Sequence, residues 1–90
     1  MSPISRDRIG RLLDEAEGYL MRHLPRQSLQ ILESRPDWST MQFEAQFLKG
    51  EALRCLERYR EALKPLEIAA SLQPSDTRVA LALGWCYKRT

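Results

Sequence analysis

Few side chains of the kinds that carry out catalysis or bind metals occur in this sequence of 90 residues. Its single histidine, His23, lies at an expected helix end beside Arg22, where we expect it to cap backbone carbonyls and not to act as a base. Cys55 and Cys86 have no second cysteine or histidine at metal-ligand spacing. We therefore predict two buried free thiols and no metal site; a disulfide or redox role for the cysteines is the alternative.

Carboxylates and arginines are the other candidates for chemistry. Asp14 and Glu17 lie on an expected exposed helix stretch, which favours solvated charges paired with residues three or four positions away. Arg6, Arg8 and Arg11 crowd the same stretch, but acidic residues interrupt them and no aromatic residues alternate with them. We expect neither general acid–base catalysis nor nucleic-acid binding, so the chain is predicted to be no enzyme and to need no cofactor.

Composition indicates one folded domain. The chain is 43% hydrophobic and carries 14 basic and 12 acidic residues interleaved along its length, for a net charge of +2. A continuous apolar run of about 18 residues is missing, and so is the apolar core of a secretory signal. These features predict a soluble, cytoplasmic protein without membrane association.

Apolar residues at three-and-four spacing predict five helices, at about 5–23, 25–35, 40–57, 59–73 and 77–89. Pro25 suits a first helical turn, whereas Pro65 falls inside the fourth helix, where a bend is expected. Ser39 and Gln42 form a candidate capping box flanked by Trp38 and Phe43 at hydrophobic-staple spacing. Asp76 is the expected N-cap of the fifth helix.

A period of 34 residues connects these helices. It relates Gly50 to Gly84, and Phe47 both to Leu81 and, one period earlier, to Leu13. Glycine at this slot, with Ala62 and Ala69 opposite, would let the two helices of a pair approach closely, while Tyr59, Leu66 and Tyr87 fill the space between. A fixed spacing of this size is typical of stacked helical repeats.

In this register the chain resembles tetratricopeptide repeats. The run Leu83-Gly84-Trp85-Cys86-Tyr87 follows Pro74 as in that family, and the preceding unit has small and large residues at the expected offsets: Gly50, Tyr59, Ala62, Leu66, Ala69 and Pro74. The resemblance implies an all-α, right-handed stack of antiparallel helix pairs, an α-solenoid of five helices and about two and a half units, in one domain. The units would span about 9–42, 43–76 and 77–90. The first departs most from the pattern, and the third lacks its second helix.

In similar proteins the first helices of successive units line a concave groove that holds a peptide or helix of a partner protein. The resemblance implies a groove here of nine residues: Leu13, Glu17, Leu20, Phe47, Glu51, Arg54, Leu81, Trp85 and Lys88. At the places of the family's carboxylate clamp only Arg78 is basic, so that clamp is absent. Because Glu17 and Glu51 lie one period apart, the groove is expected to favour apolar anchors and a basic residue. The alternative is that several of these residues only pack against their neighbours.

A second functional hypothesis concerns the fifth helix. Four of its residues lie where a helix completing the unit would pack, namely Val79, Ala80, Leu83 and Tyr87. If this patch is exposed, it favours self-association into a homo-oligomer. The sequence therefore predicts a protein-binding scaffold, with self-assembly as the alternative.

Overall fold

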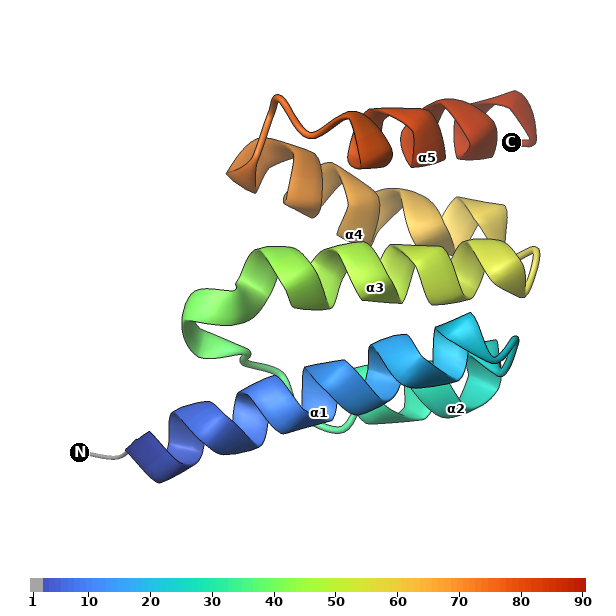
Figure 1. Cartoon of the computed structure of the whole chain (residues 1–90). Helices are drawn as coiled ribbons and strands as arrows, with labels where there is room; N and C mark the ends of the chain where they lie inside the picture. The colour runs from blue at the N-terminus through green and yellow to red at the C-terminus, as the bar shows by residue number, and fades with distance from the viewer. Residues whose placement is uncertain (1–2) are drawn as a thin grey trace.

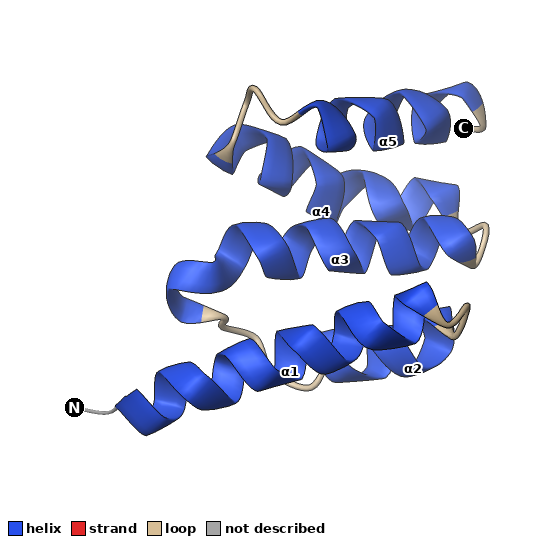
Figure 2. Cartoon of the chain, in the orientation of Figure 1, coloured by secondary structure: helices blue, strands red, loops and turns tan. Residues whose placement is uncertain are grey.

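The computed structural model describes residues 3–90 and consists of helices joined by short loops (Figures 1 and 2). The helices are α1 (Pro3–Met21), α2 (Pro25–Leu32), the 3₁₀-helix η1 (Ser39–Met41), α3 (Gln42–Cys55), α4 (Tyr59–Leu72) and α5 (Thr77–Lys88). No strand occurs within residues 3–90. The predicted all-α class and the five α-helices are confirmed.

Consecutive helices run antiparallel and pack against one another in chain order (Figure 1). The α3 helix is central, because it contacts α2 and α4 and also reaches α1 and α5. The helices α1, α3 and α5 point in the same direction, so their side chains can share one face of the molecule (Figure 1).

The turns after α1 and α3 have the same geometry. His23 (φ 63°) and Glu57 (φ 62°) adopt the left-handed conformation. After α1, the Leu24 N–H donates to the Tyr19 carbonyl at 2.8 Å, and after α3 the Arg58 N–H donates to the Leu53 carbonyl at 2.9 Å. This is the Schellman pattern, which satisfies the last carbonyls of a helix with backbone donors. His23 therefore ends α1 through its backbone conformation and not, as predicted, through a side-chain cap.

The start of α3 differs from the predicted capping box. Ser39 has a left-handed backbone (φ 57°), and neither it nor the residues after it cap the helix with a side chain. Instead, Asp37 Oδ1 accepts hydrogen bonds from the Ser39 N–H and from Gln42 Nε2, both at 3.0 Å. The predicted staple is also wrong, because Trp38 and Phe43 pack in different hydrophobic clusters.

Small residues make the helices pack closely. Four alanines are completely buried, Ala16, Ala52, Ala62 and Ala69, and Leu66 is buried as fully. Cys86 lies in the same cluster as Ala52, Ala62 and Leu66, and burial raises the pKa of its thiol. Cys55 is exposed, so the prediction of two buried thiols is wrong for this residue.

The two glycines of the 34-residue register have different surroundings. A Cβ atom added at Gly50 would meet Cγ and Cδ2 of Leu66 at less than 3.0 Å, so a side chain at this position would collide with α4. A Cβ atom added at Gly84 would meet nothing within 4 Å. The expected close approach is confirmed for Gly50 and wrong for Gly84, because no helix within residues 3–90 packs on that side of α5.

These two glycines form a matched pair of substitution sites. Both substitutions to alanine gain about 1 kcal/mol of helix propensity. In Gly50→Ala the collision with Leu66 adds an overpacking cost of about 1–3 kcal/mol, whereas Gly84→Ala has no such cost. Urea denaturation should therefore show Gly84→Ala to be more stable than Gly50→Ala by about 1–3 kcal/mol. Equal free energies of unfolding for the two variants would contradict the close contact between α3 and α4.

Candidate partner-binding groove

Two adjoining hollows lie along α1, α3 and α5. The first, between α1 and α3, has a volume of about 120 Å³ and is lined by Leu13, Asp14, Glu17, Met41, Phe43, Glu44, Phe47, Leu48 and Arg78. The second, between α3 and α5, has a volume of about 370 Å³ and is lined by Phe47, Glu51, Arg54, Arg78, Leu81, Ala82 and Trp85. Because Phe47 and Arg78 line both, we treat the two hollows as one groove.

Most of the residues predicted to line a groove do so. Leu13, Glu17 and Phe47 line the first hollow, and the second is lined by Phe47, Glu51, Arg54, Leu81 and Trp85. Leu20 and Lys88 line neither. Leu20 packs against the core instead, and Lys88 is exposed at the end of α5.

The floor of the groove is apolar and partly belongs to the core. Leu13 and Phe43 are buried, whereas Phe47 and Leu48 are half-buried. The rings of Phe43 and Phe47 stack with centroids 6.2 Å apart and planes 4° apart. Leu13 therefore packs mainly against its neighbours, as the alternative interpretation of the sequence proposed, while Phe47 remains accessible to a ligand.

The α5 side of the groove is apolar and open. Leu81 is 75% exposed and Trp85 is 46% exposed. The Arg89 guanidinium lies 3.7 Å from the centre of the Trp85 ring, close enough for a cation–π contact. These two side chains offer apolar surface that the described part of the chain leaves uncovered.

Glu51 and Arg54 form an ion pair. Arg54 Nη2 lies 2.6 Å from Glu51 Oε1 one helical turn away, and both side chains are largely shielded from solvent. The hydrogen bond to Glu51 raises the pKa of Arg54. Arg54 thus balances the charge of Glu51 inside the groove. Glu51 therefore does not act together with Glu17 to favour a basic ligand residue, as was expected from the sequence.

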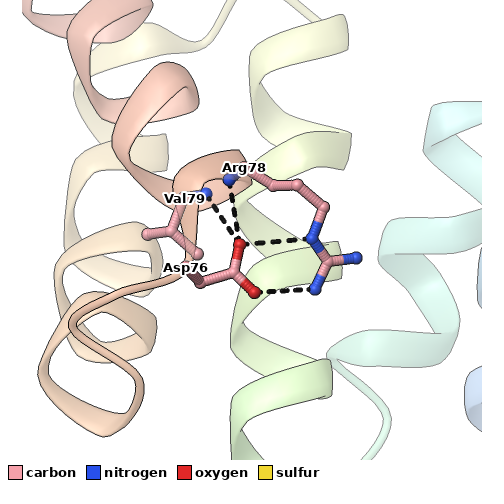
Figure 3. Close-up of polar contacts among 3 residues, drawn as sticks. All are labelled: Asp76, Arg78 and Val79. Carbon is pink, nitrogen blue, oxygen red and sulfur yellow. Dashed lines mark hydrogen bonds and ion pairs between the residues drawn. The ribbon is translucent and has the colours of Figure 1, made fainter.

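Asp76 holds the side chain of Arg78, a residue that lines both hollows, through two hydrogen bonds (Figure 3). Arg78 donates from Nε to Asp76 Oδ1 at 3.2 Å and from Nη2 to Oδ2 at 2.9 Å. Asp76 Oδ1 also accepts from the backbone N–H groups of Arg78 and Val79, at 2.9 and 3.4 Å, which confirms the predicted N-cap of α5. The Arg78 guanidinium lies 4.7 Å from the centre of the Phe47 ring. One carboxylate thus caps α5 and positions Arg78, a cation that lines both hollows.

Three further carboxylates line the first hollow, namely Asp14 and Glu17 of α1 and Glu44 of α3. None of them forms an ion pair with a described side chain. Asp76 has the largest effect on the pKa of Arg78, and the charges of Glu17 and Glu44 raise it further. These two carboxylates therefore lie close enough to Arg78 to interact with its charge. Asp14, Glu44 and Arg78 were not among the predicted groove residues. Helical spacing could have identified Glu44, which lies one turn before Phe47 on the same face.

The predicted self-association surface is only partly exposed. Val79 is 1% exposed and packs with Phe43 and Ala69, so its predicted exposure is wrong. Leu83 packs against two core clusters. Ala80 and Tyr87 are exposed, and Tyr87 donates from its hydroxyl to Glu67 Oε2 at 2.6 Å. This hydrogen bond to a carboxylate raises the pKa of Tyr87.

Other kinds of site find no support in the described residues. Within this part of the chain, no group of three or more histidine, cysteine, aspartate or glutamate side chains is placed to hold a metal ion. None of the helices described here has the length and apolar character needed to cross a membrane. Compared with known proteins, the chain matches no family model, no curated protein and no solved structure.

The Asp76–Arg78 pair predicts a pH-dependent contribution to stability. The hydrogen bond from Arg78 lowers the pKa of Asp76 from its ordinary value of 3.8. A carboxylate whose pKa is lower in the folded state stabilises the fold above its unfolded pKa, and this effect is lost as pH falls through the folded pKa. Asp76→Asn keeps a good N-cap residue but removes the charge. Urea midpoints should therefore be lower for Asp76→Asn at neutral pH and converge with those of the wild type below pH 3.8. A difference that stays constant with pH would contradict the pair.

Proposed function

We propose that this chain is a tetratricopeptide-like module, a right-handed α-solenoid of about two and a half helix pairs that binds another protein. The two Schellman turns support this proposal, because His23 and Glu57 are 34 residues apart and have the same backbone conformation. The close packing of Gly50 against Leu66 also fits the pattern. A cytoplasmic location, expected from the sequence, is part of this proposal.

The groove along α1, α3 and α5 is the proposed binding site for a peptide or helix of the partner. The observation that carries this proposal is the combination of exposed Leu81 and Trp85 with the accessible Phe47 in one continuous hollow. Apolar side chains grouped in this way, beside charged ones, are typical of protein-binding surfaces. The module would act as a scaffold without catalysis and without recognising a terminal carboxylate.

The first test is selection from a phage-displayed library of random peptides. The wild-type chain should enrich peptides that bind in the groove, and the double variant Leu81→Ala/Trp85→Ala should bind them about tenfold or more weakly by fluorescence anisotropy, because it removes the exposed apolar anchors. Both side chains are largely outside the core, so the variant should keep its helical circular dichroism spectrum.

The matched control for this test is Met21→Ala/Leu72→Ala. Met21 is 75% exposed and Leu72 is 49% exposed, and neither lines the groove. This control should bind the selected peptides as the wild type does. Absence of enriched peptides, or equal loss of binding in the two double variants, would refute the groove as the binding site.

Self-association through α5 is a second candidate, favoured by the open space beside Gly84. Val79 is buried in the core and Leu83 is half-buried. The exposed part of the predicted self-association surface therefore consists mainly of Ala80, Gly84 and Tyr87. We expect the chain to remain monomeric because Tyr87 is the one large side chain exposed on this surface, and its hydroxyl is already bonded to Glu67. Light scattering over a series of concentrations measures this. A mass that rises with concentration and returns to that of the monomer in Ala80→Glu would favour self-assembly.

A further inference from the structure

The groove has an uneven distribution of charge along its length. Its α1 end carries Asp14, Glu17 and Glu44 around the half-buried Phe47 and Leu48. Its α5 end carries Leu81 and Trp85, with the Arg89 guanidinium over the Trp85 ring, beside the balanced Glu51–Arg54 pair. A ligand in the groove would therefore meet negative charge at one end and apolar surface at the other.

The cation at the middle of the groove does not cancel this charge. Among the described side chains, Arg78 is the only basic one that lines the first hollow, and both of its donors to Asp76 are within 3.2 Å. Since Asp76 balances Arg78, the three remaining carboxylates keep their charge without a partner among the described side chains. A cationic side chain of a ligand could pair with these carboxylates.

The floor of the first hollow also suits a lysine or arginine side chain. Such side chains place their methylene stems along apolar surface and keep the charged end near water or an opposite charge. Leu48 and Phe47 offer the apolar surface, and Glu17 and Glu44 approach from the two flanking helices. A carboxylate in the same position would be repelled by like charges.

We propose, on the basis of the proposed function, that the partner segment carries a lysine or arginine for the α1–α3 hollow and a large apolar side chain for the α3–α5 hollow. The hollows lie on either side of α3, so their centres are about one helix spacing, roughly 10 Å, apart. This distance corresponds to about three residues of an extended peptide or about seven residues of a helix. The partner thus binds in one direction, with its basic residue toward α1.

The test selects peptides on the wild-type chain and then compares their affinity for the wild type with their affinity for charge variants. Selected peptides should be enriched in a basic residue separated from an apolar one by this distance. Glu17→Gln/Glu44→Gln should bind them about three- to tenfold more weakly, since it removes two exposed negative charges that would pair with the basic residue of the peptide. Added salt should reduce this difference.

The matched control removes the same charge elsewhere. Glu15→Gln/Glu33→Gln alters two exposed glutamates that do not line the groove, so its affinity should equal that of the wild type. A charge reversal provides a test of gain: Glu17→Lys/Glu44→Lys should prefer peptides whose basic residue has been replaced by glutamate.

The two proposals can fail separately. Peptides that require Leu81 and Trp85 but show no basic residue, or that bind Glu17→Gln/Glu44→Gln as tightly as the wild type, would overturn the proposed charge recognition and leave the groove in place. Enrichment of acidic peptides would overturn it as well. Failure to enrich any peptide that depends on Leu81 and Trp85 would overturn the binding function itself.

Discussion

The contact between Gly50 and Leu66 is the constraint on which the rest of the arrangement depends. Because α3 has no side chain at this point, the completely buried Leu66 of α4 can fill the space against its backbone. The α3 helix is the only helix that contacts all four others within residues 3–90, so its distance from α4 also determines where α5 packs. The groove lies on both sides of α3, and its shape therefore follows from a core contact and not from the surface residues alone.

The start of α5 connects stability to the charge of the groove. Asp76 satisfies backbone donors at the helix N-terminus, and the same carboxylate holds the Arg78 guanidinium over Phe47. An arginine without this partner would be free to pair with Glu17 or Glu44, whose charges already act on it. Asp76 therefore has two roles: it caps α5, and it pairs with Arg78 so that Glu17 and Glu44 remain available to a ligand.

Apolar periodicity in the sequence predicted the five helices, the 34-residue period predicted the close approach at Gly50, and the residue type alone predicted the cap at Asp76. It could not predict which helix face would be covered. Neighbouring residues on a helix point about 100° apart, so Val79 is buried while Ala80 is exposed. Charge pairing was also missed, because the Glu51–Arg54 bond depends on side-chain conformations that spacing permits but does not require. The Asp37 contact at η1 was missed for the same reason.

The three faces of α5 explain why the groove is a better binding site than the outer surface of this helix. One face, with Val79, Ala82 and Cys86, is already used by the core. The outer face with Ala80, Gly84 and Tyr87 has open space, but Tyr87 is its one large exposed side chain and is hydrogen-bonded to Glu67, so a partner would bury less apolar surface there than in the groove. The groove face has Leu81 and Trp85 next to a fixed cation, and carboxylates follow on the far side of α3. The groove face thus combines the larger apolar area with a defined charge, and binding that is both favourable and selective requires both.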